Sequence, residues 1–68
     1  MTAIGVQSAA MTPRQLRRWM EREGYSVRSL AERLGVEPST VQRWRDGSRT
    51  IPPFLELALE RVAQIDAL

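Results

Sequence analysis

The sequence predicts an all-α fold in which four helices, or five if a short extra turn forms, surround one core. Three observations predict it. The chain has 68 residues, enough for one small domain. Its apolar residues recur three and four positions apart, which is the spacing of one helix face, and no stretch alternates with the period of a strand. Glycine, proline and short polar residues separate the apolar stripes, as expected of helix ends.

The first predicted helix spans residues 13–23. Thr12 provides an N-cap, Pro13 suits the first helical position, and Gln15 completes a capping box. Gly24 supplies a left-handed stop. One apolar stripe faces the core and consists of Leu16, Trp19 and Met20. The preceding residues 1–11 carry no charge and no helical period, so we expect a flexible N-terminal arm there.

Two short helices follow. The first begins after the cap residue Ser26 and ends at Gly35, and its apolar stripe is Val27, Leu30, Ala31 and Leu34. After a tight turn, the second begins at Pro38 and ends at Gly47, and its inward residues are Val41 and Trp44. Helices this short are stable only when they pack against the rest of a domain.

The last predicted helix runs from about Pro53 toward the C-terminus. Its apolar residues cover more of the helix surface than a single core face requires. We assign the surplus to a subunit interface made of Leu59, Val62 and Ile65. A core this small also favours a partner subunit, so the sequence predicts a two-fold homodimer through this helix.

The residue inventory excludes several kinds of site. The chain has no Cys, His or Lys, and all ten of its basic residues are arginine. Zinc fingers, disulfides, Cys or His nucleophiles and Schiff-base lysines are therefore excluded, and we expect no enzyme, metal, cofactor or small-molecule ligand. No apolar run approaches the roughly 18 residues of a membrane span, and the N-terminus does not resemble a secretory signal. We expect no membrane partner and a cytoplasmic location.

Charge is unevenly distributed along the chain. Residues 12–49 hold nine arginines and five acidic residues, a balance of +4. Residues 50–68 hold one arginine and three acidic residues, a balance of −2. The middle of the chain is therefore the part that a polyanion would meet, and the apolar, mildly acidic tail is available for protein contacts.

Two short helices joined by a tight turn at a glycine form a helix-turn-helix arrangement. Residues 25–47, YSVRSLAERLGVEPSTVQRWRDG, resemble the Cro/C1-type (XRE) family of bacterial and phage DNA-binding regulators. The segments LAERLGV at 30–36 and VQRW at 41–44 are highly typical of that family, and the resemblance covers about residues 12–60. It implies a single lambda-repressor-like helix-turn-helix domain over residues 12–68.

The resemblance also implies that the helix at residues 38–46 lies in the major groove of DNA while the preceding helix crosses the backbone. A helical wheel agrees, because the side opposite the inward residues is polar. The expected base contacts are Ser39, Gln42 and Arg43, of which Arg43 suits the O6 and N7 acceptors of guanine and Gln42 suits adenine. The expected backbone contacts are Arg28, Thr40, Arg45 and Arg49.

Three residues depart from the family pattern. Val27 stands where a bracing Gln is common, Glu37 replaces a common Ser or Thr cap, and Pro38 replaces a polar, base-reading residue. Val27 and Pro38 have no side-chain hydrogen-bonding groups, and the carboxylate of Glu37 lies near phosphate. The departures shift the expected contacts toward Ser39, Arg43 and the other arginines.

The function that these observations favour is a sequence-specific, double-stranded DNA-binding transcriptional regulator. A regulator this small resembles the repressors and autoregulators of phages, mobile elements and toxin–antitoxin operons, and a homodimer would bind a palindromic operator. The alternative is a protein-interaction module that binds its partner through the apolar C-terminal helix. Such a module would be similar to an antitoxin or a regulator-binding protein.

Overall fold

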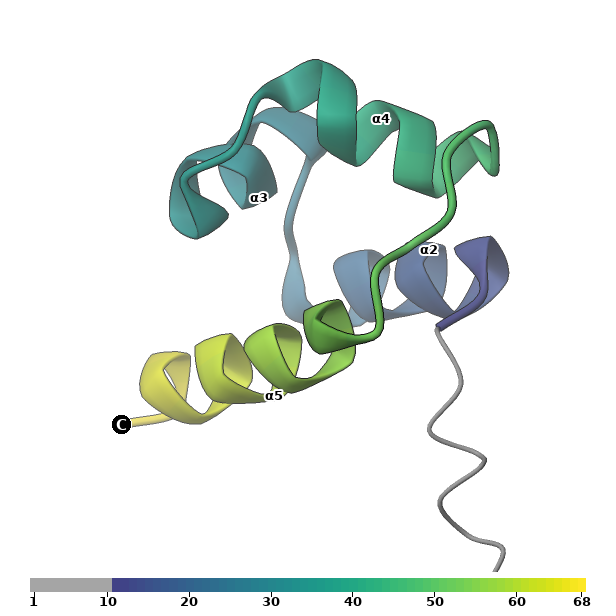
Figure 1. Cartoon of the computed structure of the whole chain (residues 1–68). Coiled ribbons are helices and arrows are strands. Elements are labelled where there is room, and N and C mark those ends of the chain that lie inside the picture. The colour runs from purple at the N-terminus through teal and green to yellow at the C-terminus, as the bar shows by residue number, and fades with distance from the viewer. Residues whose placement is uncertain (1–10) are drawn as a thin grey trace, which may run out of the picture.

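The computed structural model describes residues 11–68 and contains four helices over that range (Figure 1). Helix α2 spans Pro13–Glu23, α3 spans Val27–Leu34, α4 spans Pro38–Asp46 and α5 spans Phe54–Asp66. No strand and no additional helical turn occurs in the described part of the chain, so the all-α prediction is confirmed, with four helices over residues 11–68. None of these helices is both long enough and apolar enough to cross a membrane.

The predicted helix ends are confirmed. The Thr12 hydroxyl accepts a hydrogen bond from the Gln15 amide at 3.1 Å, and the Gln15 side chain accepts one from the Thr12 amide at 2.9 Å. Ser26 and Ser29 form a second reciprocal box at the start of α3. Gly24, Gly35 and Gly47 all adopt positive φ at the ends of α2, α3 and α4.

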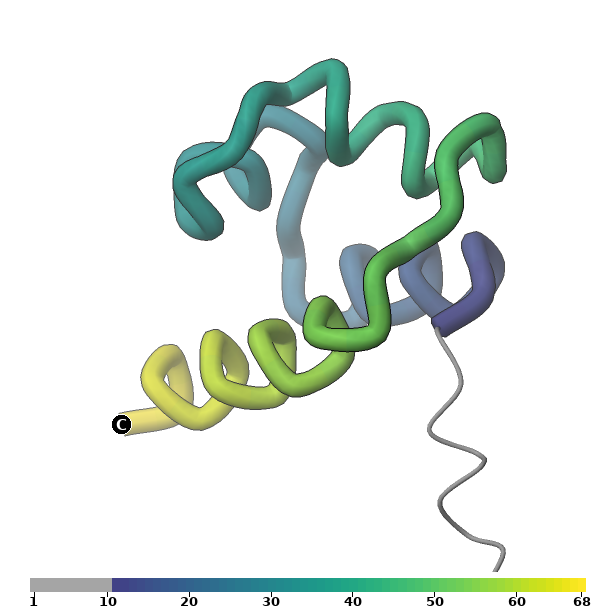
Figure 2. The backbone as a smooth tube through the Cα atoms, viewed as in Figure 1, coloured from purple at the N-terminus to yellow at the C-terminus, as the bar shows by residue number. Residues whose placement is uncertain are grey.

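The helices form two layers around one core (Figures 1 and 2). Helices α3 and α4 make one layer and α2 and α5 the other, and α4 packs on both α3 and α2. The core contains the predicted inward residues of α2, α3 and α4 together with Ile51 and the inner face of α5. Its largest fully buried side chains are Leu16, Leu30, Val41, Leu55 and Leu59.

Helix α5 corrects the prediction for the dimer interface. Leu59 and Val62 are only 1% and 8% exposed, so they belong to the core of the single chain and offer a partner almost no surface. With Leu55 they repeat at positions i, i+4 and i+7, the spacing of one inward helix face. Ile65, at 44% exposure, is the one predicted interface residue that lies on the surface.

A different set of apolar residues is exposed on α5. Phe54 and Leu57 are 64% and 68% exposed, and at 100° per residue they and Ile65 lie on the side of the helix opposite Leu59. We call Phe54, Leu57 and Ile65 the apolar ridge. The helix therefore has both a complete core face and an outward apolar face.

Met11 is half-buried and packs against the core. The prediction assigned it to the N-terminal arm together with residues 1–10, so the packed domain begins one residue earlier than expected. The rest of the predicted arm, residues 1–10, lies outside the described residues.

The C-terminal end of α5 is tied to α3 by three polar side chains. The Tyr25 hydroxyl donates a hydrogen bond to Asp66, and Arg33 Nη2 pairs with Asp66 Oδ1 at 2.8 Å. Arg33 Nε also donates to the Tyr25 hydroxyl at 3.3 Å, and the Tyr25 ring stacks on Trp19 with centroids 5.5 Å apart. The Tyr25 hydrogen bond and the Arg33 guanidinium lower the pKa of Asp66, so its carboxylate form is favoured.

Candidate nucleic-acid interface

The arrangement of α3 and α4 is fixed by a tight turn at Gly35. Gly35 has φ +76°, and the amides of Gly35 and Val36 both donate to the Ala31 carbonyl, at 2.9 and 3.0 Å. Ala31 and Val41 are completely buried where the two helices pack together. A small side chain and a β-branched one therefore fill the junction, and α4 is held firmly with one face outward.

That outward face carries the side chains that the wheel predicted. Val41 and Trp44 are buried beneath α4, whereas Ser39 and Arg43 are exposed. The Arg43 side chain forms no hydrogen bond or ion pair with any residue between 11 and 68. Within that part of the chain its guanidinium therefore uses none of its donors, and they can serve an external acceptor.

Gln42 is placed differently from the other two predicted base-contact residues. It is half-buried, and its Nε2 donates to both carboxylate oxygens of Asp46, at 3.1 and 3.3 Å. The pair spans i and i+4 on α4, so the bond runs along the helix surface. Part of the donor capacity of the Gln42 amide is therefore already used within α4.

Two of the predicted backbone contacts line a common groove. Arg28, at the start of α3, and the half-buried Arg45, at the end of α4, border a groove of about 430 Å³ together with Gln42 and Arg17. Arg17 extends from α2, and its Nη1 donates to the Arg45 carbonyl at 3.0 Å. We call Arg17, Arg28 and Arg45 the arginine cluster.

Arg17 lines this groove, although sequence reasoning did not single it out. Its position in α2 marks it only as one of several arginines on a solvated face. The contact with Arg45 joins residues 28 positions apart and arises from the packing of α2 against α4. Because the last carbonyls of a helix lack partners within it, the Arg17 guanidinium also satisfies the C-terminal end of α4.

The other predicted contacts lie apart from this groove. Thr40 is half-buried in the first turn of α4, where its amide donates to the Glu37 carbonyl at 2.9 Å. Arg49 is exposed in the loop after α4, and its amide donates to the Arg43 carbonyl at 3.2 Å. Among the positions that depart from the family pattern, Val27 packs against the core and Glu37 makes no capping bond with its side chain.

The comparisons with known proteins agree with this geometry. The sequence profile of a helix-turn-helix domain family matches residues 14–66, a range that spans all four described helices except the first residue of α2. No curated protein sequence and no solved structure matches the chain. The match agrees with the resemblance to Cro/C1-type regulators that residues 25–47 carry. The chain therefore belongs to this family of helix-turn-helix domains, a DNA-binding class of protein.

Proposed function

We propose that this protein is a sequence-specific transcriptional regulator that binds double-stranded DNA, with α4 in the major groove. The observation that carries the proposal is Arg43, which is exposed on the outward face of α4 and makes no side-chain bond to any residue between 11 and 68. Its setting is proposed to be a phage, mobile-element or toxin–antitoxin operon in the cytoplasm, where it represses its own or neighbouring genes. The role is one of binding, and the proposal assigns it no catalysis.

Base reading is assigned to α4. Arg43 would donate two hydrogen bonds to O6 and N7 of a guanine, a pairing that discriminates against a wrong base by about 1–3 kcal/mol. Ser39, exposed near the start of the helix, supplies a short hydroxyl donor and acceptor. Gln42 would read an adenine after it exchanges its Asp46 bond for the base.

Backbone contacts are assigned to both sides of α4. The arginine cluster would meet phosphates where the start of α3 and the end of α4 approach each other. Thr40 and Arg49 would add contacts from the first turn of α4 and from the following loop. These contacts hold the protein in register on the duplex, and they do not depend on the base sequence.

The proposal includes a homodimer that binds a palindromic operator. The apolar ridge of α5 takes the place of the buried Leu59 and Val62 as its contact surface, and Ile65 is retained. The ridge is supported by its exposure, because large apolar side chains grouped on one helix face are a common feature of subunit interfaces. Two copies would place their α4 helices about 34 Å apart, on successive major grooves.

The test is binding to the DNA immediately upstream of the protein's own gene, measured by fluorescence anisotropy at several salt concentrations. Arg43→Ala should weaken specific binding by about ten- to a hundredfold, the equivalent of about 1–3 kcal/mol. Arg22→Ala, which removes an exposed guanidinium that does not line the groove beside α4, is the control and should bind like the parent. Arg28→Ala should weaken binding to all sequences alike. It should also reduce the slope of log affinity against log salt concentration by about 1, the equivalent of one phosphate contact.

Unchanged binding of Arg43→Ala would overturn the assignment of α4. A second function has one observation in its favour, the exposure of the apolar ridge, which could grip a different protein instead of a second copy. That protein-interaction role predicts no salt-sensitive affinity for DNA, whereas the regulator predicts an affinity that falls steeply with salt.

A further inference from the structure

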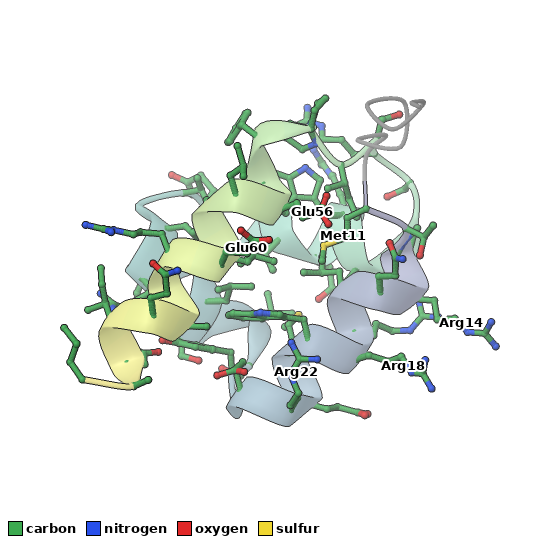
Figure 3. The ribbon with its side chains drawn as sticks, turned by 90° about the horizontal axis from the view of Figure 1, so that it is seen from below. Met11, Arg14, Arg18, Arg22, Glu56 and Glu60 are labelled. Atoms are coloured by element: carbon green, nitrogen blue, oxygen red, sulfur yellow. The ribbon has the colours of Figure 1, made fainter. Side chains whose placement is uncertain are left out.

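A second groove lies between α2 and α5, on the side of the molecule away from α4 (Figure 3). Two adjoining parts of about 390 and 270 Å³ share Met11, Trp19, Arg22 and Glu56 among their lining residues. Leu59 and Ala63 complete an apolar floor. None of the residues assigned to DNA lines this groove, so a molecule bound to DNA through α4 would leave it open.

The two rims of this groove carry opposite charges. Arg18 and Arg22, one helical turn apart, form the rim on α2, and Glu56 and Glu60, also one turn apart, form the rim on α5. All four side chains are exposed.

No ion pair within 4 Å joins the two rims in the described chain, and the one pair that they make is between Arg22 and its neighbour Glu23, at 3.3 Å. The groove is thus an apolar strip between a basic edge and an acidic edge that do not neutralise each other.

We propose that a second copy of this chain binds to this groove, face to face, with the two-fold axis running along it. A rotation about that axis exchanges left and right, so the basic rim of each copy meets the acidic rim of the other. Both pairs of rims are then satisfied at once. A rotation about an axis across the groove would instead set arginines against arginines, and this argues for the first orientation.

This self-association differs from the proposed dimer on DNA. It uses the acidic side of α5, with Glu56 and Glu60, whereas the apolar ridge lies on another side of the same helix. Because α4 is on the far side of each copy from the groove, the pair presents its two α4 helices on opposite outer surfaces (Figures 1 and 3). Given the proposed function, the back-to-back pair would hold two separate DNA segments rather than two half-sites of one duplex.

A charge exchange tests the self-association in the absence of DNA. In the variant Arg18→Glu/Arg22→Glu both rims are acidic, and in Glu56→Arg/Glu60→Arg both rims are basic. In sedimentation equilibrium, the assembly formed by each variant alone should have half the mass of the parent assembly. An equimolar mixture should regain the parent mass, because acidic rims then face basic rims. Association of the parent and of the mixture should weaken with added salt.

The control is Arg14→Glu, a charge reversal at an exposed position of α2 that lines neither part of the groove and should leave the mass unchanged. The proposal is overturned if either double variant associates like the parent, if the mixture fails to recover the lost mass, or if the parent is monomeric. Far-UV circular dichroism checks that each variant is folded. If a double variant is unfolded, Arg18→Glu and Glu60→Arg repeat the exchange with one substitution each.

DNA bridging is measured separately, as capture of a fluorescent duplex by bead-bound duplex, both carrying the upstream sequence. Arg43→Ala should lose bridging because it no longer binds DNA, yet it should keep its self-association. The double variants should keep DNA binding and lose bridging, and their mixture should restore it. Failure of the proposed function and failure of the self-association therefore give different results.

Discussion

Replacing Leu59 by alanine tests whether α5 is a structural part of the domain. Leu59 is 1% exposed and lies in the core with Leu16, Leu30 and Leu55. Truncation removes a fully buried side chain and leaves a cavity, for which a loss of about 3 kcal/mol is typical. A domain of this size has a free energy of unfolding of only about 3–10 kcal/mol, so a large fraction of the stability is lost.

The matched substitution is Leu57→Ala, two residues away on the same helix. Leu57 is 68% exposed, so the same chemical change should cost less than about 0.5 kcal/mol. Each kcal/mol corresponds to about 4–8 °C in the melting temperature of a small domain. Leu59→Ala should therefore melt at least about 12 °C lower, and Leu57→Ala should melt almost with the parent.

Melting is followed by far-UV circular dichroism at low protein concentration, where subunit contacts contribute least. The reasoning is wrong if Leu57→Ala is destabilised as much as Leu59→Ala, because that result would place Leu57 inside the core. It is equally wrong if Leu59→Ala melts like the parent at low concentration, but its melting temperature no longer rises with protein concentration as that of the parent does. Such a result would return Leu59 to a subunit interface.

Two further predictions concern polar contacts. The pKa of Asp66 is lowered by its hydrogen bonds to Tyr25 and Arg33, so its stabilising effect is present above the ordinary aspartate pKa of 3.8 and is lost as the pH falls through the lower, folded-state value. Asp66→Asn should lower the melting temperature at neutral pH and flatten its acid dependence in pH-resolved melts; an identical acid profile would contradict this. Asp46→Ala removes a negative charge from the outward face of α4 and frees the Gln42 amide, so DNA affinity should rise by about fivefold, equivalent to about 1 kcal/mol. Weaker binding in the anisotropy titration would show instead that Asp46 orients Gln42 for reading.

Most of the fold could be predicted because its signals are local. The capping box at Thr12 and the left-handed glycine at Gly35 involve only residues a few positions away. The neighbouring sequence is therefore enough to predict these helix ends. The outward face of α4 followed in the same way, since Val41 and Trp44 define the inward side of a short helix.

The features that were missed depend on contacts across the fold. Arg17 reaches the Arg45 carbonyl, and Tyr25 reaches Asp66 41 positions along the chain. Neither contact leaves a periodic trace in the sequence. The error at Leu59 has a related cause: apolar residues occupy much of α5, and only its packing in the folded chain decides which of them turn inward.

The positions of the two tryptophans give the protein built-in optical reporters. Trp44 is buried under the outward face of α4, whereas Trp19 stacks on Tyr25 and lines the groove between α2 and α5. Trp44→Phe would leave an emission spectrum that comes from Trp19 alone and responds to events in that groove. Trp19→Phe would leave one that responds to the surroundings of α4. Two single-tryptophan proteins could therefore follow the two faces of the molecule independently, without an attached dye.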